Sequence, residues 1–447
     1  MGHYVPHTDA EIAEMLTFLG MSSLEELFAT VPDALRLAGG LDLDPGLSEP
    51  DTMAALERLS DRNRRAGREL VCFAGGGAYD HEVPATVRRV AFRSEFVTAY
   101  TPYQPEVAQG VLQALFEYQT LLCRLTGMEV ANASLYDGAS ACVEAVNLGA
   151  AATGRDLVEV SKGLNPNWRR VIHTYGAGSG HDIHERSLSS GTTNWGELEQ
   201  IGAQQPGVIV VQHPNYLGCL EDLDAARRRA EAKGAILVVA FDPVAAGLLR
   251  SPGAYGADVV VGEGQPFGTP LSFGGPYLGL FACKREQVRR LPGRLVGESV
   301  DVDGRRAYVT TLRTREQDIR REKASSNVCT NQTLIAVACA VQLAWLGTSG
   351  LGELALRCAR GTRYAREALL AIDGVEPHND APVFREFAVT TPTLGEIVVE
   401  RMAEEGFLAG IPLGEEYGER GLLISVTERR TRDEIDAFAA AFEKVIR

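Results

Sequence analysis

The sequence predicts an α/β protein with a mostly parallel sheet covered by helices, a smaller C-terminal α+β domain and an N-terminal helical arm. Runs rich in Val and Ile alternate with amphipathic segments between 155 and 260, which is typical of parallel strands buried on both faces. After about 350, shorter strands accompany helices instead. We therefore expect an arm at 1–60, a large domain at 61–340 and a small domain at 341–447.

Four apolar runs are the predicted strands of the large sheet: 156–161, 207–212, 235–242 and 257–262. The amphipathic stretch 221–233 predicts a helix between two of them. Ligands in sheets of this kind bind beyond the carboxyl ends of the strands. Functional residues are therefore expected in the segments that follow these strands.

The remaining elements are predicted from helical stripes and capping boxes. Thr8 with Glu11 and Ser22 with Glu25 fit capping boxes for two short helices in the arm, and Thr431 with Glu434 fits a third near the C-terminus. Further helices are expected at 51–68, 109–127, 350–371, 394–405 and 431–447, and further strands at 386–390 and 422–427.

Composition excludes several classes of function. The 447-residue chain has a net charge of −15, which argues against nucleic-acid binding. Its eight cysteines form neither a C-x-x-C pair nor a zinc-type cluster, so we expect reduced thiols, no metal site and a cytoplasmic location. The polar start is unlike a secretory signal, and the apolar runs are broken by Asp or Pro, so no membrane segment is expected.

The loop after the strand 257–262 raises the central question. Asp242 ends the strand before it, and in pyridoxal-phosphate enzymes an Asp at this place meets the pyridinium nitrogen, while a Lys after the next strand forms the Schiff base. The loop here offers Glu263 and Gln265 but no Lys. The chain is therefore either such an enzyme or a protein of the same fold that lacks the lysine for binding the cofactor aldehyde.

Other segments allow two interpretations each. The stretch from Ser134 to Ser140 precedes a small-residue helix whose N-terminus suits a phosphate, although Ser-rich caps are common everywhere. The glycines in 73–84 indicate either a pocket wall or a packed turn. The basic segment 311–332 could hold an anion or an acidic partner, or form a solvated helix face.

Five long stretches, in order along essentially the whole chain, resemble the glycine cleavage system P-proteins, and more narrowly the alpha chains of bacterial P-proteins that are split into two subunits. These stretches are FAGGGAYDHEVP, RSEFVTAYTPYQPEVAQGVLQALFEYQT, VANASLYDGASA, GEGQPFGTPLSFGGPYLG and REKASSNVCTNQ.

The resemblance implies a fold of the aspartate aminotransferase type, which is fold type I of the pyridoxal-phosphate enzymes. It implies the activity of glycine dehydrogenase (aminomethyl-transferring), which decarboxylates glycine and passes the aminomethyl group to the lipoyl arm of H-protein. In the split form, alpha and beta chains assemble as α2β2. The beta subunit carries the cofactor lysine, so pyridoxal phosphate is expected there and not covalently on this chain.

Transferred residue by residue, the resemblance leaves a vestigial cofactor frame. Gln265 takes the lysine position, and a Gln amide can only donate or accept hydrogen bonds. Asn165 stands where the family usually has the His that stacks on the ring. No catalytic residue is therefore expected in this chain, and Asp242 needs a partner other than a pyridinium nitrogen. The frame consists of Ser134, Gly138, Ser140, Asn215 and Asp242.

The resemblance also indicates an active site in the partner chain that borrows groups from this one. Tyr100, Tyr103 and Arg320 are the candidates, because the first two lie in a Pro-fixed loop and the third in the basic segment. Core tyrosines remain the other interpretation of the loop. Two alternative functions stay open: a self-sufficient pyridoxal-phosphate enzyme that uses another lysine, and a non-catalytic scaffold that only stabilises the beta chain or docks H-protein.

Overall fold

The computed structural model describes residues 6–37, 41–97, 102–196 and 204–447. The chain forms two compact units, Met1–Arg65 and Ala66–Arg447. The predicted boundary at 340/341 lies inside the long helix α9 (Thr333–Leu370), and the division of the second unit into two domains stays a prediction.

The first unit contains α1 (Asp9–Leu19), two short 3-10 helices and α2 (Glu49–Ser60), and none of the residues in these elements is buried. The capping box at the start of α1 is confirmed. The second predicted box is wrong, because the Ser22 amide donates to Glu26 and the element that follows is the 3-10 helix Leu24–Phe28. The predicted helix 51–68 ends at Ser60, where a charged segment without an apolar stripe follows.

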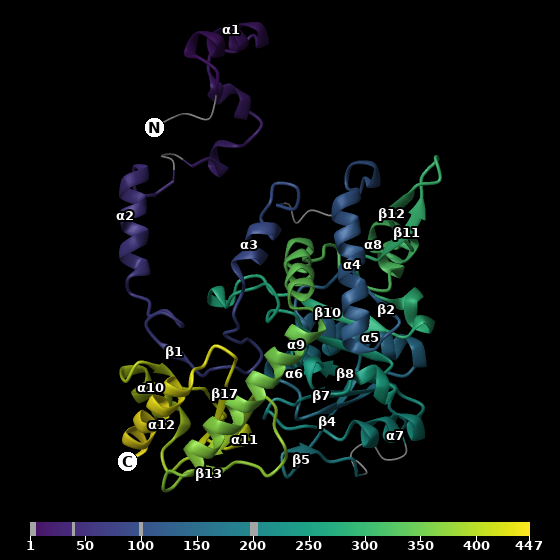
Figure 1. Ribbon diagram of the computed structural model, residues 1–447. Helices are drawn as coiled ribbons and strands as arrows, with labels where there is room; N and C mark the ends of the chain where they lie inside the picture. Colours follow the sequence, from purple (N-terminus) through teal and green to yellow (C-terminus); the bar gives the residue numbers. More distant parts are fainter. Residues whose placement is uncertain (1–5, 38–40, 98–101, 197–203) are drawn as a thin grey trace. The chain divides into compact units, whose positions relative to one another are not determined.

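A seven-stranded sheet forms the centre of the second unit (Figure 1). Its strand order is β2-β10-β9-β8-β7-β3-β4. The strands from β9 to β4 run parallel, and β10 is antiparallel to both of its neighbours. All four predicted strands are present. In sheet order the strands are Val130–Ala131, Gly279–Cys283, Val259–Glu263, Ile236–Phe241, Val208–His213, Leu157–Ser161 and Asp182–Arg186.

Both faces of this sheet are buried. Along β7, Val208 and Val210 belong to one apolar cluster, while Ile209 and Val211 belong to another, as the two-residue period of a strand requires. The first cluster contains residues of α5 (Gly138–Thr153) and α6 (Pro166–Ser179). The second contains residues of α4 (Gln109–Thr126), α7 (Leu223–Lys233) and α9. Helices on both faces explain why the strands read as continuous apolar runs.

A four-stranded sheet, in the order β13-β14-β17-β16, forms the C-terminal part. It packs with α10 and α12 around a cluster of Phe and other apolar side chains. The capping box of Thr431 and Glu434 opens α12, as predicted. The elements are β13 (Glu376–Pro377), β14 (Glu386–Thr390), α10 (Gly395–Glu404), β15 (Phe407–Leu408), β16 (Ile411–Pro412), α11 (Gly414–Tyr417), β17 (Gly421–Ser425) and α12 (Arg432–Ile446).

Smaller elements link these two sheets. β1 pairs with β15 in parallel, so the glycine-rich segment near 75 starts from the edge of the C-terminal part. These elements are β1 (Val71–Cys72), α3 (Ala85–Ala91), β5 (Leu188–Ser189), β6 (Thr192–Thr193), β11 (Val296–Val300), β12 (Arg306–Thr310) and α8 (Gln317–Arg320).

Helix α9 begins at Thr333, before the predicted start at 350, and its backbone breaks at Gly347 with φ 59°. By length and composition alone it could cross a membrane, which the sequence analysis did not foresee. Its residues Ala336, Cys339 and Leu343 are nevertheless buried in the core against the sheet. The preceding segment 311–332 is not one helix, since its longest helix in the described residues is the short α8.

Candidate functional site

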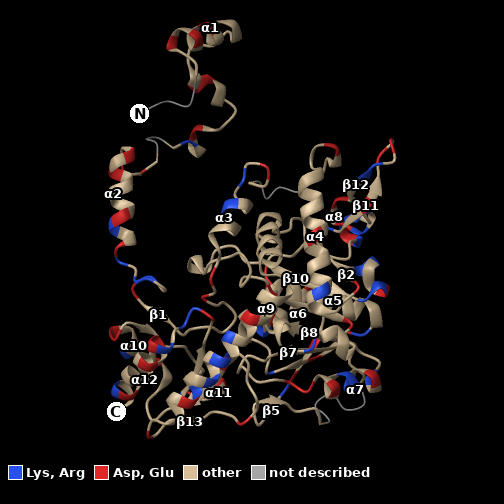
Figure 2. Ribbon diagram, in the orientation of Figure 1, with Lys and Arg blue, Asp and Glu red and all other residues tan. Residues whose placement is uncertain are grey.

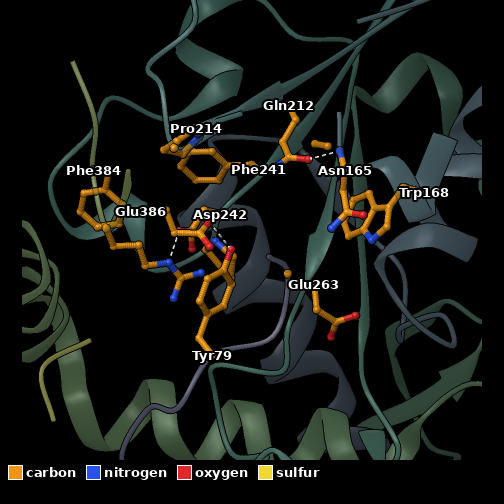
Figure 3. Close-up of a pocket in the computed structure, with 15 residues that line it drawn as sticks. Tyr79, Asn165, Trp168, Gln212, Pro214, Phe241, Asp242, Glu263, Phe384 and Glu386 are labelled. Atoms are coloured by element: carbon orange, nitrogen blue, oxygen red, sulfur yellow. Dashed lines mark hydrogen bonds and ion pairs between the residues drawn. The ribbon is translucent and has the colours of Figure 1, made fainter. Parts of the chain in front are cut away.

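A small cavity lies beyond the carboxyl ends of β7 and β8, the place where sheets of this kind bind ligands (Figure 3). Its volume is about 40 Å³. Because one water molecule needs roughly 10–15 Å³, the cavity has room for a few waters only. It is lined by Gly77, Tyr79, Asn165, Trp168, Gln212, Pro214, Gly218, Ala240, Phe241, Asp242, Pro243, Glu263, Phe384, Arg385 and Glu386.

Asp242, at the end of β8, is paired with an arginine of the same chain. Its Oδ2 lies 2.6 Å from Nε of Arg385, whose side chain is only 3% exposed. The guanidinium also lies over the Tyr79 ring, 3.4 Å from the ring centroid. Burial by itself lowers the pKa of Arg385, but the charges of Asp242 and Tyr79 raise it, and the net shift is upward. Arg385 therefore supplies the cation that Asp242 needs.

A histidine and a glutamate extend this pair. Arg385 Nη1 contacts His81 Nε2, and His81 Nδ1 lies 2.6 Å from Oε2 of Glu428. Because a guanidinium can only donate, Nε2 accepts and the His81 proton sits on Nδ1. Cys358 joins His81 and Glu428 in a group whose ligand atoms lie within 4.8 Å of one another, as in a metal site. Since both ring nitrogens of His81 are already engaged, the hydrogen-bond network accounts for this cluster.

Glu263, at the end of β9, occupies the N-terminus of helix α5. Its Oε2 accepts from the Gly138 amide at 2.9 Å, and its Oε1 accepts from the amides of Gln265 and Leu278, both at 2.9 Å. Burial raises the pKa of Glu263 to about 7, although these three amides oppose the shift. The free N–H at the start of the helix is thus bound to an internal carboxylate.

A second carboxylate and a tryptophan close the same helix end. Asp137 is the N-cap residue, and its Oδ1 accepts from the Ser140 amide at 2.7 Å. A Cβ at Gly138 would lie 2.2 Å from the Trp168 ring, so only glycine allows this packing. A phosphate dianion here would meet the Asp137 carboxylate and would have to displace the Glu263 carboxyl group from the helix amide.

Gln265 is fully buried and uses its amide as a structural brace. Its Oε1 accepts from the Tyr79 amide at 3.0 Å, and its Nε2 donates to the carbonyls of Tyr79 (3.0 Å) and Thr269 (2.9 Å). Both donors and one acceptor position are therefore satisfied within the chain. The residue at the predicted lysine position ties the glycine-rich segment to the loop after β9.

The glycine-rich segment is both a pocket wall and a packed turn, the two interpretations that its sequence allows. Gly77 lines the cavity, while the Gly76 amide donates to Oε1 of Glu386 at 2.7 Å. A Cβ at Gly75 would lie 2.3 Å from that oxygen. The Tyr79 hydroxyl donates to Oε2 at 2.7 Å, and burial raises the pKa of Glu386 to about 7. The tight packing of this turn fixes its backbone, and the fixed backbone forms one wall of the cavity.

The other predicted site residues have structural partners outside the cavity. Ser134 Oγ accepts from the Gln332 amide at 3.1 Å. Asn215 Nδ2 donates to Gly191 O at 2.7 Å and to Glu221 Oε1 at 2.8 Å. Asp242 lines the cavity, whereas Gly138 and Gln265 border it through their hydrogen bonds to Glu263.

The residues proposed for a partner's active site lie elsewhere. Tyr100 is outside the described residues. Tyr103 is 39% exposed, and its hydroxyl accepts from Nη2 of Arg294 at 3.1 Å. Arg320 ends α8 and is exposed. None of the described candidates lines the cavity of this chain, so their role toward a partner stays a prediction.

Two neighbours at the start of β14, Arg385 and Glu386, are site residues that the sequence does not identify. The strand itself was predicted, but no local signal assigns its first residues to a site on the other sheet. A buried charge needs a partner, and that rule required a cation near Asp242 without identifying it.

These side chains do not fit pyridoxal phosphate. The cavity is too small, and Arg385 already provides the positive charge beside Asp242. Glu263 holds the helix N-terminus at which a phosphate would be bound. The buried Gln265 cannot form a Schiff base.

The sequence profile of the family described as "Glycine cleavage system P-protein" matches residues 2–442. A probable glycine dehydrogenase (decarboxylating) subunit 1 of Desulforamulus reducens is 46% identical over 439 residues, covering 98% of each chain. That of Chlorobium chlorochromatii is 48% identical, also over 98% of each chain.

Solved structures extend the comparison. A crystal structure of glycine decarboxylase (P-protein) of the glycine cleavage system in inhibitor-bound form superposes with a TM-score of 0.92 at 45% identity, covering 99% of this chain and 100% of that one. Mouse CSAD superposes with a TM-score of 0.69 at 16% identity, covering 95% and 92%, and at that identity shows the fold alone. The architecture is that of the fold type I pyridoxal-phosphate enzymes. The chain belongs to the glycine cleavage system P-protein family.

Proposed function

We propose that this chain is the alpha subunit of a split P-protein. With a beta subunit, in an α2β2 assembly, it decarboxylates glycine and passes the aminomethyl group to the lipoyl arm of H-protein. The beta subunit holds pyridoxal phosphate, and this chain supports that site without a covalent cofactor of its own. The relatives named subunit 1, which match over nearly their whole length, support this role.

One observation supports the proposal that the beta chain, and not this chain, holds the cofactor. At each of three positions where the fold would bind the cofactor, a side chain of this chain has taken over: Arg385 beside Asp242, Glu263 at the start of α5, and Gln265 at the lysine position. A partner chain with a lysine is therefore needed for the chemistry.

Two exposed residues support a contribution to the partner's site. Tyr103 lies beside Arg294 and Arg313, with guanidinium carbons 5.2 and 5.7 Å from its ring centroid. Arg320 is exposed at the end of α8. A hydroxyl held by an arginine and a cation at the surface can both reach an anionic group on a second chain. In the scaffold alternative, neither residue affects turnover.

Reconstitution tests the proposal. The alpha and beta chains are purified separately, and decarboxylation of glycine with lipoylated H-protein is measured for each alone and for the mixture. We expect turnover from the mixture only. Full turnover by this chain alone would refute the subunit role.

A pair of tyrosine variants then separates catalytic support from scaffolding. Tyr103→Ala is expected to reduce turnover with assembly unchanged in size-exclusion chromatography. Tyr175→Ala, which removes a half-exposed tyrosine on α6, serves as the control. Equal turnover in both variants would favour the scaffold.

We also propose a cytoplasmic location. All eight cysteines are free thiols, and six of them are buried. Such a set is usual where the compartment keeps thiols reduced. The acidic composition supports partners other than nucleic acid and membranes.

A further inference from the structure

A second hollow, separate from the cavity, lies in the C-terminal part between α9 and the start of α12. Its volume is about 610 Å³, and its lining shares no residue with that of the cavity. We call it the arginine hollow. It is lined by Arg357, Arg360, Gly361, Tyr364, Glu428, Arg430, Arg432 and Ile435.

The arginines come from two helices and the turn before α12. Arg357 and Arg360 lie on α9, where Figure 2 shows blue segments repeated along the lower half of the helix. Arg430 precedes α12 and Arg432 begins it. Four guanidinium groups face one hollow in a chain whose net charge is −15. Like charges repel, so such a gathering needs anions nearby.

Two of these arginines form no ion pair within 4.0 Å among the described residues, although neighbouring carboxylates act on both of them electrostatically. Arg360 has no ion pair within 4.0 Å and no hydrogen bond there, and Arg432 Nε donates to the uncharged Tyr364 hydroxyl at 3.1 Å. Arg357, by contrast, is paired with Glu353 at 2.7 Å. The hollow therefore presents free guanidinium donors.

Arg430 differs from the other arginines of the hollow, because it is buried and paired with carboxylates. Its side chain is only 3% exposed. Nη2 donates to Asp80 Oδ2 at 3.2 Å and Nη1 lies 3.8 Å from Glu434 Oε1, but the buried Nε has no hydrogen-bond partner. A buried charged donor without an acceptor is costly. Because this nitrogen is buried, it is not exposed to the hollow, and Arg430 contributes a fixed positive charge there and no free donor.

The single carboxylate in the lining does not serve as an acceptor for these described arginines. Glu428 Oε1 accepts from the Glu82 amide at 2.8 Å, and Oε2 is bound to His81. Burial alone raises the pKa of Glu428, but the hydrogen bonds from His81 and from the Glu82 amide lower it, so the net shift is downward. Its oxygens are held toward the His81 network, and the arginines of the hollow remain available.

We propose that the arginine hollow binds a phosphate-bearing small molecule. The planar guanidinium fork matches phosphate oxygens bidentately, and several such groups around one hollow suit an anion of more than one charge. The volume lies within the roughly 300–1,000 Å³ usual for small-molecule sites. Tyr364 and Ile435 provide the apolar surface for the organic part of the ligand.

Isothermal titration of the full-length chain with inorganic pyrophosphate tests this assignment, with a repeat on the complex with the beta chain. We expect saturable binding to the wild type that weakens as salt is added. In Arg360→Gln the affinity should fall about 10-fold or more, the usual effect of losing a hydrogen bond to a charged group.

Arg363→Gln is the matched control, because Arg363 lies one turn further along α9, is 81% exposed, pairs with Glu367 and does not line the hollow. It should bind pyrophosphate as the wild type does. An equal loss of affinity in both variants would mean that pyrophosphate responds only to the overall positive charge of the surface. That result would overturn the proposal. Absence of pyrophosphate binding at millimolar concentration, or binding of an oligoglutamate peptide in its place, would overturn it as well.

Discussion

The cavity beyond β8 and the arginine hollow are both charged, yet they differ in how their charges are paired. In the cavity, Asp242, Arg385 and Glu263 each have a partner within the chain. In the hollow, Arg360 forms no hydrogen bond and no ion pair within 4.0 Å among the described residues. Charges that satisfy one another hold a fold together, whereas an exposed charge without a close partner stays available to a ligand. The place where the fold would bind its cofactor has thus become structural.

The largest effect is expected from breaking the paired site. Arg385→Met leaves Asp242, whose side chain is 13% exposed, without a cation, which should lower the free energy of unfolding by about 3–5 kcal/mol. Urea denaturation measures the change. The double variant Asp242→Leu with Arg385→Met should recover part of the loss, because both charges are then gone. A cost below about 1 kcal/mol for the single variant would contradict the view of this pair as structural.

A lysine at position 265 tests whether the other side chains of the cavity also exclude the cofactor. Gln265→Lys removes the acceptor of the Tyr79 amide, so we expect a loss of about 1–3 kcal/mol in unfolding free energy. With added pyridoxal phosphate the variant should show no aldimine absorbance, since Arg385 and Glu263 still fill the site. An aldimine band in this single variant would show that only the lysine was missing.

The pH dependence of stability tests Glu263. Its pKa is raised from 4.5 to about 7, so between these values the folded chain holds a proton that the unfolded chain has released. The stabilising contribution is full below pH 4.5 and is lost as the pH rises to about 7.

Glu263→Gln removes this proton uptake. The advantage of the wild type over the variant in unfolding free energy should therefore shrink by at most about 1.4 kcal/mol per pH unit in that window. His213 has the opposite sign, because burial lowers its pKa to about 4, but it is common to both proteins and cancels in the comparison. Parallel pH profiles for the two proteins would be inconsistent with a buried proton on Glu263.

The smallest effect belongs to the hollow. Arg360→Gln removes an exposed charge with no partner among the described residues, so unfolding free energy in the absence of anions should change by no more than about 0.5 kcal/mol. Thermal melts with and without pyrophosphate measure this change in stability. A large loss of stability without any anion would mean that Arg360 is structural, and the contrast between the two regions would fail.

Much of the fold could be predicted because its signals are local. Val/Ile-rich runs identify β7 and β8, and the capping box at Thr431 marks the start of α12. The start of α9 was missed, because apolar residues throughout a buried helix give no one-sided stripe.

The site was predicted only in part. Asp242 was expected to need a new partner, and Gln265 was expected at the lysine position. Arg385 could not be identified, since its contact with Asp242 forms only when the C-terminal sheet packs beside the larger one. Helix α5 was expected to offer its N-terminus to a phosphate, but the carboxylate that fills it comes from the end of β9. Pairings between distant segments depend on tertiary structure, which local patterns do not encode.

The most direct measurement is borohydride reduction of the assembled alpha and beta chains with pyridoxal phosphate, followed by mapping of the labelled peptide. A cavity filled by Arg385, Glu263 and Gln265 predicts a label on a lysine of the beta chain and none on this chain. The lone alpha chain should likewise remain unlabelled. A labelled lysine in this chain would contradict this prediction. It would show that the chain binds the cofactor covalently by itself.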